Sequence, residues 1–199
     1  TVIPLDVHGR PLRPAIAYLD TRSTAEAAWM LERAPEIPQV TGNRVLPGNT
    51  SLASALWIRA HEPEIAARTA TWAQVNTFLF QWLTGERRAD WTNASFMGLF
   101  DYMRMSWSAA LAEKLHVNLD HFAPVNAPHS IAPLLPEVAR ELGLRPGMPV
   151  ALGGIDGAMS SVGVGAIHIG EAYDVSGTSE MVAVCTPNPV VCPELLGRW

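Results

Sequence analysis

The most distinctive pattern of apolar and small residues lies in the last third of the chain. An apolar run at 148–152 leads into two glycines, Asp156 and a second run of apolar and small residues at 157–165. This pattern predicts a buried strand, a tight turn and a helix that begins at or beside Asp156. An aspartate there can cap the helix, or its carboxylate can point out of the strand end, where open α/β sheets bind ligands. Gly154 and Gly157 leave no side chain to block a substrate.

Helices and short strands are predicted along the rest of the chain. Residues 1–20 alternate as a β-hairpin would, with a turn at 6–10. Ser23 and Glu26 fit a capping box for a helix that ends near Arg33. Further helices are predicted after the turn-rich loop at 41–50, from Pro63, over 73–83 with Gly85 as C-cap, over 107–115, and over 134–142.

A second candidate site follows the predicted helix. Residues 173–176 and 181–184 are predicted strands, joined by a turn through Gly177, Thr178 and Ser179. The tip of such a hairpin offers backbone amides and hydroxyls with little bulk, which suits phosphate oxygens. A simple turn is the alternative.

Two common nucleotide-binding motifs are absent from the sequence. The glycines after residue 162 do not fit G-x-G-x-x-G, since His168 stands where the third would fall, and there is no G-x-x-x-x-G-K-[ST]. A nucleotide site in this chain would therefore need a different geometry.

Composition narrows the classes of function. The 199 residues are 48% hydrophobic, enough for the core of one domain or one and a half. Charged residues make up 17% and the formal net charge is −5, which argues against a nucleic-acid-binding surface. No apolar run approaches the roughly 20 residues of a membrane-spanning helix. Two cysteines are too few for a disulfide framework or a zinc site, and His116, His121 and His129 lack metal-like spacing.

The two ends of the sequence give expectations about the cellular compartment of the protein and about whether the chain is complete. The first residues contain no apolar segment of the kind found in signal peptides, so the cytoplasm is the expected compartment. The chain lacks an initiating Met and stops at Trp199 in mid-pattern, so we expect a piece of a longer protein.

The segment GGIDGAMSSVGVG at 153–165 resembles the part of the FGGY carbohydrate kinases, the family of xylulokinase and glycerol kinase, that contains their catalytic aspartate. PAIAYLDTRST at 14–24 is similar to a strand-end block of that family. LTGE at 83–86, followed by the turn at 90–95, is similar to another. The Gly-Thr-Ser turn some 20 residues after Asp156 is similar to the hairpin with which these kinases contact ATP phosphates. The resemblance runs from about residue 5 to residue 184.

The resemblance implies an α/β, actin-like and ribonuclease-H-like fold in which two domains close on a cleft. Residues 1–168 would form the later part of the first, sugar-binding domain, and 169–199 would open the second, nucleotide-binding domain. The implied activity is ATP-dependent phosphorylation of a sugar or polyol hydroxyl, with ATP and Mg²⁺. Xylulose-like pentuloses lead the candidate substrates, ahead of glycerol, gluconate and other polyols, and a homodimer is left open. Magnesium ligands other than Asp156 and the adenine site would lie outside this chain.

The same resemblance assigns roles to individual residues. Asp156 would be the catalytic base. The sugar would contact a set drawn from two loops and the helix start: Tyr18, Gly48, Asn49, Asp156 and Gly157. The ATP phosphates would contact the turn formed by Gly177, Thr178 and Ser179.

For several of these candidate site residues, a purely structural role is the alternative. Asp156 can be an ordinary N-cap, Tyr18 a core aromatic at a strand end, and Gly48 with Asn49 a helix-capping loop. The turn at 90–95 is interpreted as structural.

The chain also departs from the family pattern at a few positions. Leu19 replaces an Asn, Ser54 lies where related kinases tend to have a Lys, and Asn76-Thr77 replaces a Lys-Asp pair. The last two departures favour a rival interpretation, a non-catalytic actin-like fold kept as a sugar-binding or interaction module. The hydrolase alternative is weaker, because no serine has G-x-S-x-G spacing.

Overall fold

The computed structural model describes residues 1–177, 180–187 and 190. Its helices are α1 (Thr24–Arg33), α2 (Ile37–Thr41), α3 (Ser51–His61), α4 (Pro63–Arg68), α5 (Val75–Thr84), α6 (Trp91–Ala94), α7 (Ala109–Lys114), α8 (Pro136–Leu142) and α9 (Asp156–Gly163), with short 3₁₀ helices η1 (Ser95–Met97) and η2 (Leu119–His121). Its strands are β1 (Ile3–Leu5), β2 (Thr71–Ala73), β3 (Ala89–Asp90), β4 (Phe100–Asp101), β5 (Ser106–Trp107), β6 (Val125–Asn126), β7 (Ile131–Pro133), β8 (Pro149–Ala151), β9 (Ala172–Ser176) and β10 (Glu180–Val184).

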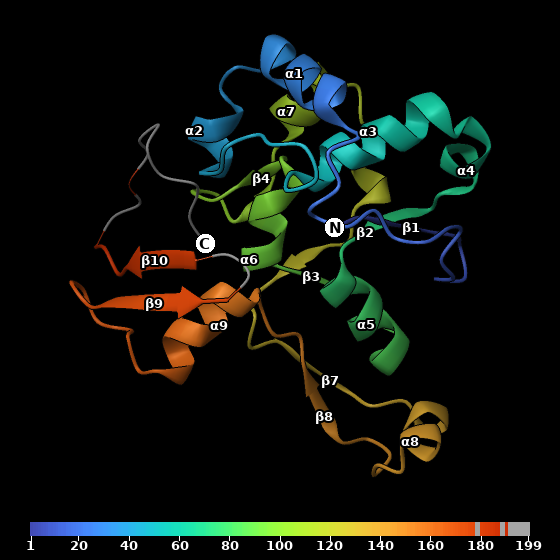
Figure 1. Ribbon diagram of the computed structural model, residues 1–199. Helices are drawn as coiled ribbons and strands as arrows, with labels where there is room; N and C mark the ends of the chain where they lie inside the picture. Colours follow the sequence, from blue (N-terminus) through green and yellow to red (C-terminus); the bar gives the residue numbers. More distant parts are fainter. Residues whose placement is uncertain (178–179, 188–189, 191–199) are drawn as a thin grey trace.

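The described strands associate in pairs. β1–β2, β4–β5, β7–β8 and β9–β10 are antiparallel, and β3–β6 is parallel. In Figure 1, α1, α2, α3 and α7 lie together at the top of the molecule, while β7 and β8 extend away as an arm with α8 at its tip. Helix α9 and the β9–β10 ribbon form a third part beside the body.

The main hydrophobic core lies among the upper helices. Its fully buried side chains come from α1, α2, α3, α7 and the segments that join them, and the largest are Met30, Ile37, Leu52, Ile58, Leu99, Leu111 and Leu115. Burial of each such side chain contributes about 1.5–3 kcal/mol. This core fixes the helices from which the candidate sugar-binding loops project.

The N-terminal hairpin was only half predicted correctly. The turn after β1 is present, with the N–H of Gly9 bonded to the Asp6 carbonyl at 3.0 Å. The run at 12–18 is not a strand, however, and this part of the chain makes only the single bridges Val2↔Ile16 and Leu5↔Pro11. Pro11 and Pro14 lack the N–H that a ladder requires. The regular partner of β1 is instead β2, with Ile3 opposite Ala73.

Helix α1 has the predicted bounds but not the predicted cap. Ser23 occupies the N-cap position without accepting a side-chain capping bond. Its buried hydroxyl instead lies 3.5 Å from that of Ser54 and accepts the N–H of Gly48 at 3.4 Å. The capping-box prediction is therefore wrong, because tertiary contacts with the loop at 41–50 occupy the serine.

Glycine C-caps end two of the predicted helices. α5 stops at Gly85 and α8 at Gly143, both in the left-handed conformation. These ends are confirmed as predicted, because they depend on local backbone geometry that glycine adopts readily.

The sequence predicts a buried strand before Asp156, but this strand is largely exposed. In β8, Pro149 and Ala151 are exposed and Val150 is partly buried. The strand pairs only with β7 in the described chain, and the pair packs on α5 through a small cluster of Phe80, Ala132 and Leu152. Because one face of this ribbon lacks a covering layer, its alternating residues stay exposed.

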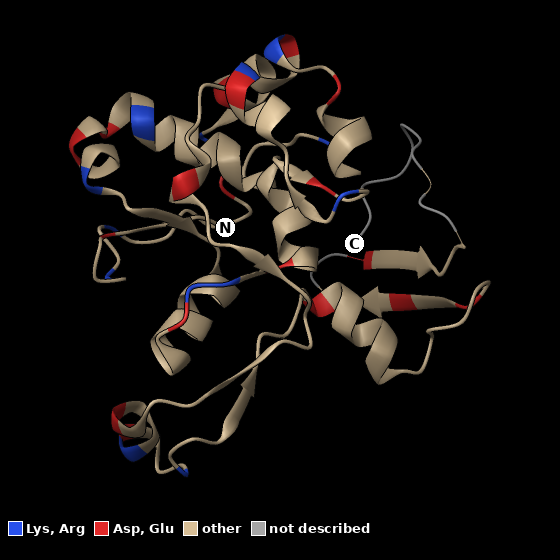
Figure 2. Cartoon of the chain, turned by 180° about the vertical axis from the view of Figure 1, so that it is seen from behind, with Lys and Arg blue, Asp and Glu red and all other residues tan. Residues whose placement is uncertain are grey.

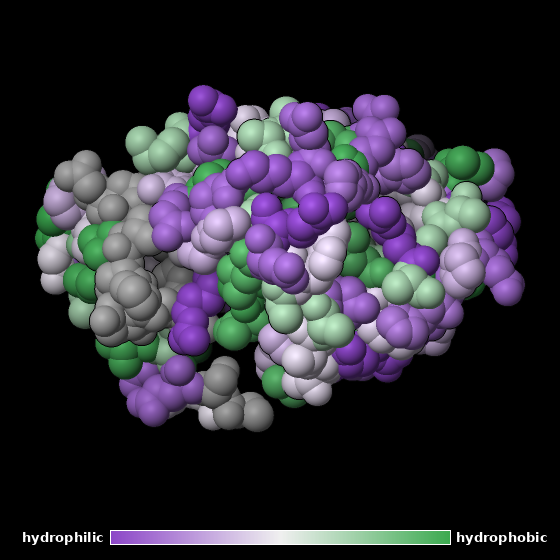
Figure 3. Space-filling model, turned by 90° about the horizontal axis from the view of Figure 1, so that it is seen from above, coloured by the Kyte–Doolittle hydropathy of each residue, from purple (hydrophilic) through white to green (hydrophobic). Residues whose placement is uncertain are grey.

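Hydrophobic residues reach the surface near the C-terminal ribbon. Figure 3 shows a mainly hydrophilic upper face, with hydrophobic residues beside the grey segment. Six aliphatic side chains of the α9–β9–β10 part are more than half exposed: Val162, Val164, Ile167, Ile169, Val182 and Val184. On this side the ribbon has no packing partner among the residues that the structure describes.

Truncation in the core should destabilise the chain far more than the same truncation at the surface. Leu99 is fully buried and Leu19 is 69% exposed. We expect Leu99→Ala to lower the free energy of unfolding by about 2–5 kcal/mol and Leu19→Ala by under about 0.5 kcal/mol. Urea denaturation of the chain measures both, and equal losses would contradict the packing described here.

Candidate active site

Asp156 is the first residue of α9, as the sequence predicts. The N-cap position belongs to Ile155, which has an extended backbone (φ −61°, ψ 141°). The carboxylate of Asp156 is exposed, and its Oδ1 accepts the N–H of Gly157 at 2.8 Å. The helix-capping alternative is therefore only partly correct: Asp156 bonds one amide of the first turn from inside the helix. The exposed carboxylate thus lies beside the free amides at the start of α9.

The glycines before Asp156 serve packing as well as access. A Cβ at Gly154 would lie 2.8 Å from Oγ1 of Thr92 and 2.9 Å from Cε of Met159. Gly153 has a φ of +72°, which favours glycine. Gly157 is buried, and its carbonyl accepts the hydroxyl of Tyr173 at 3.0 Å. The turn is thus held closely against two neighbouring segments.

One of those segments is the turn at 90–95. Thr92 accepts the N–H of Ile155 on its hydroxyl oxygen at 2.8 Å. The same hydroxyl donates to the buried carboxylate of Asp90, which also accepts the side-chain amides of Asn76 and Asn93. Sequence reasoning assigned this turn a structural role and missed its contact with the residue before Asp156. In the sequence, the only indication of this contact was the group of polar residues within 90–95.

The second candidate segment is a hairpin, as predicted. β9 and β10 are antiparallel, with Ser176 opposite Glu180. Gly177 follows β9 and is exposed, whereas Thr178 and Ser179 lie outside the described residues. The hydrogen bond from Tyr173 in β9 to Gly157 joins this hairpin to the first turn of α9.

Charge around these elements is acidic. Figure 2 shows acidic residues and no basic ones on α9, β9 and β10. The sequence contains no Lys or Arg between Arg145 and Arg198.

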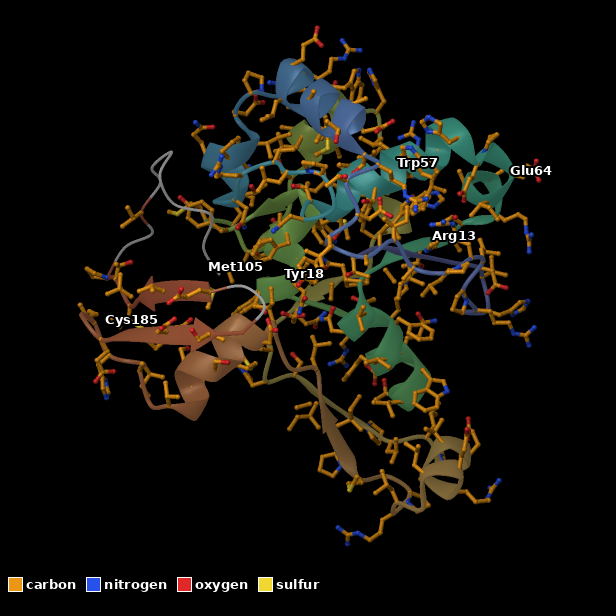
Figure 4. All side chains as sticks on the ribbon, viewed as in Figure 1. Arg13, Tyr18, Trp57, Glu64, Met105 and Cys185 are labelled. Atoms are coloured by element: carbon orange, nitrogen blue, oxygen red, sulfur yellow. The ribbon has the colours of Figure 1, made fainter. Side chains whose placement is uncertain are left out.

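The structure brings two of the predicted sugar-binding loops together. A Cβ at Gly48, whose φ is +72°, would lie 2.4 Å from the carbonyl oxygen of Tyr18 and 2.5 Å from that of Asp20. Tyr18 is 52% exposed and lies near the centre of the view in Figure 4. Asn49 is partly buried, and its N–H bonds to the Pro47 carbonyl at 2.8 Å. Within the described chain, no hydrogen bond links these loops to Asp156.

An ion pair fixes the chain just after Tyr18. Arg22 contacts Asp20 at 2.7 Å and its guanidinium lies 4.8 Å from the ring centroid of Trp57. The Arg22 side chain, followed by its backbone N–H, lowers the pKa of the Asp20 carboxyl.

Metal binding is not supported by this chain alone. Over the described residues there is no group of three or more His, Cys, Asp or Glu side chains that could hold a metal ion. Nor does any helix in this part of the chain have the length and apolarity needed to cross a membrane.

One surface hollow lies away from Asp156. A hollow of about 450 Å³ lies between α2, α7 and the β4–β5 turn, and its lining includes Glu36, Val40, Met103 and Leu111. It is therefore separate from the proposed reaction site.

Comparison with known proteins decides the family. Residues 1–163 match the model of the FGGY family of carbohydrate kinases, N-terminal domain. This chain belongs to the FGGY family. It is 33% identical to the xylulose kinase of Escherichia coli (strain K12) over 176 residues, which is 88% of this chain and 36% of that protein. It is 31% identical to the xylulose kinase of Bacillus subtilis (strain 168), again over 36% of the relative.

Solved structures agree on the fold of this FGGY chain. The xylulose kinase from Rhodospirillum rubrum superposes with a TM-score of 0.90 at 28% identity, covering 98% of this chain and 40% of that one. Glycerol kinase from Plasmodium falciparum with ADP gives a TM-score of 0.82 at 25% identity, over 92% and 38%. The α/β, actin-like fold implied by the resemblance is confirmed. The chain spans 36–40% of the length of these relatives.

Loss of the Arg22 side chain should raise the pKa of Asp20. A carboxyl with a lowered pKa stabilises the fold above its ordinary pKa, and this contribution is lost as the pH falls through the lowered value. In Arg22→Met we expect the Asp20 pKa to rise but to stay below its ordinary value, because the backbone N–H of Arg22 still donates to it at 2.9 Å. NMR titration of the carboxyl carbons measures the shift. The pKa of Asp6, lowered by the backbone amides of Arg10 and His8, is the control and should not move.

A side chain at Gly48 should separate the two loops. Gly48→Ala places Cβ against backbone oxygens, whereas Gly143→Ala has a similar φ (+69°) and nothing within 4 Å. Both substitutions incur the left-handed backbone cost, so we expect Gly48→Ala to be less stable than Gly143→Ala by about 1–3 kcal/mol. Equal thermal stabilities of the two variants would show that the loops are not in close contact.

Proposed function

We propose that the complete gene product containing this chain transfers the γ-phosphoryl group of ATP to a hydroxyl of a sugar or polyol, with Asp156 as the general base. The observation that supports the proposal is the exposed carboxylate at the first residue of α9, within a chain that belongs to the FGGY family. Phosphoryl transfer depends mainly on positioning and on charge stabilisation, so one well-placed proton acceptor is sufficient.

The acid–base step follows from the environment of Asp156. Its Oδ1 is bonded to the Gly157 amide, and Oδ2 has no hydrogen-bond partner among the described residues, which leaves it able to accept the substrate hydroxyl. In the proposed step the carboxylate orients the substrate hydroxyl and takes its proton as the oxygen begins to bond to phosphorus.

Residues of the two loops and the hairpin complete the proposed site. The exposed face of Tyr18, together with Gly48 and Asn49, would contact the sugar from the first loops, and Gly157 would allow close approach at the helix. The turn that begins with Gly177 would present amides to the ATP phosphates, in accord with the lack of basic residues there. We place the boundary between the sugar-binding and nucleotide-binding domains near residue 168. Magnesium, if bound with ATP, would need ligands besides Asp156.

Xylulose-like pentuloses are the proposed substrates. Xylulose kinases from two bacteria are 33% and 31% identical to this chain, whereas the autoinducer-2 kinase of Yersinia pestis bv. Antiqua (strain Angola) is 27% identical over 99% of it. Glycerol and gluconate follow. A cytoplasmic location and a homodimer stay predictions.

The rival function is a non-catalytic module. It relied in part on Asn76, which replaces a charged residue of the family pattern. Asn76 donates its side-chain amide to Asp90, so this departure has a structural reason that does not require loss of catalysis. Sugar-dependent release of ADP by the complete gene product, tested with xylulose, glycerol and gluconate, distinguishes the two functions.

Asp156→Asn should abolish most of the activity. We expect turnover to fall at least ~10²-fold with a modest loss of sugar affinity, because the amide keeps the shape but cannot accept the proton. Steady-state kinetics of the complete gene product provide the measurement. Asp120→Asn is the matched control, since Asp120 is also exposed in the first turn of a short helix, η2. Near-normal turnover of Asp156→Asn would refute the assignment.

A further inference from the structure

A buried carboxylate, that of Asp90, is connected through Thr92 to the residue before the proposed base. Asp90 is fully buried. Its Oδ1 accepts the N–H groups of Thr92 and Asn93, each at 2.9 Å, and the hydroxyl of Thr92. Its Oδ2 accepts the side-chain amides of Asn93, at 2.9 Å, and of Asn76. A buried charge is tolerated only when hydrogen bonds replace its water, so these donors are held firmly in place.

The direction of the bonds through Thr92 is fixed by this charge. An ionised carboxylate can only accept, so the single hydroxyl proton of Thr92 must point to Asp90. The lone pairs of the hydroxyl oxygen are then free to accept the N–H of Ile155, at 2.8 Å. A charged acceptor also polarises the hydroxyl and strengthens the bond that it accepts. The chain of bonds therefore runs from Ile155 through Thr92 to Asp90.

This chain ends at the residue immediately before Asp156. Ile155 is the N-cap residue of α9, so its backbone sets the direction in which the helix, and the carboxylate at its first position, leaves the turn. Gly154 packs against the same hydroxyl, where a Cβ would lie 2.8 Å from Oγ1. Among the described residues, the turn at 153–155 is also held by two backbone bonds: the N–H of Gly153 donates to the Pro128 carbonyl at 2.9 Å, and the Ile155 carbonyl accepts the N–H of Met159 at 3.0 Å.

We propose that Thr92 is a positioning residue for the phosphoryl-transfer reaction: its hydroxyl, oriented by Asp90, anchors Ile155 and so fixes the carboxylate of Asp156. The inference rests on the proposed function for its catalytic consequence. The anchor does not touch the substrate and acts only through the backbone. A displacement of about 1 Å at a reacting group can cost ~10²-fold in rate, so loss of the anchor should lower turnover without abolishing binding.

Three substitutions in the complete gene product test the proposal. Thr92→Val keeps the shape of the side chain but removes the hydroxyl, and Thr92→Ser restores it. Thr84→Val is the matched control, because the buried Thr84 hydroxyl also accepts a backbone N–H, from Glu86 at 3.2 Å, and donates to a neighbour, the Phe80 carbonyl at 2.7 Å.

Kinetics give the first readout. We expect Thr92→Val to reduce kcat at least ~10-fold while KM for sugar and ATP changes less than ~3-fold, and Thr92→Ser to retain kcat within ~3-fold. Thr84→Val should lower the melting temperature about as much as Thr92→Val does, but it should leave kcat unchanged. Wild-type kcat in Thr92→Val, or an equal kcat loss in Thr84→Val, would overturn the proposal.

Hydrogen exchange gives a second readout that needs no activity. Peptides covering 153–156 should exchange faster in Thr92→Val than in the wild type or Thr84→Val, well below the melting temperature. Unchanged exchange there overturns the anchor. If the wild-type protein phosphorylates none of the sugars tested, the proposed function fails, while faster exchange in Thr92→Val still supports the anchor.

Discussion

A carboxylate withdrawn from water must find its hydrogen bonds within the protein, and the segments around Asp90 satisfy that requirement. Asp90 is fully buried and accepts hydrogen bonds from Asn76 of α5 and from Thr92 and Asn93 at the start of α6. The hydroxyl of Thr92 in turn accepts the N–H of Ile155, which lies 63 residues further along the chain. An unpaired buried charge would cost several kcal/mol, so the donors of Asn76, Thr92 and Asn93 are held around Asp90. The bond from Ile155 to Thr92 links the start of α9 to this cluster.

In the proposed chemistry, the two aspartates have different roles. Asp90 is enclosed and accepts hydrogen bonds from neutral donors, whereas Asp156 is exposed and retains an oxygen without a partner in the described chain. The same residue type thus serves as a fixed anchor in one place and as a candidate base in the other. Burial and donor number, not residue identity, separate the two roles.

Sequence reasoning succeeded where local geometry decides the outcome. The beginning of α9 at Asp156, the glycine ends of α5 and α8, and the β9–β10 hairpin all depend on residues adjacent in the chain. It failed where partners are distant: β1 pairs with β2, the hydroxyl of Ser23 bonds across to the loop at 41–50, and Thr92 bonds to Ile155. Such contacts are selected by the packing of the whole molecule, which periodicity and capping rules do not contain. The roles assigned to individual site residues came from family resemblance and remain predictions.

The hydroxyl of Tyr173 gives the hairpin a mechanical connection to the helix. Through its bond to the Gly157 carbonyl, the strand that leads to the proposed phosphate-binding turn is tied one residue beyond the proposed base. In the proposed reaction this bond would join the ribbon that faces the nucleotide to the helix that presents the carboxylate, so that a displacement of one would be transmitted to the other.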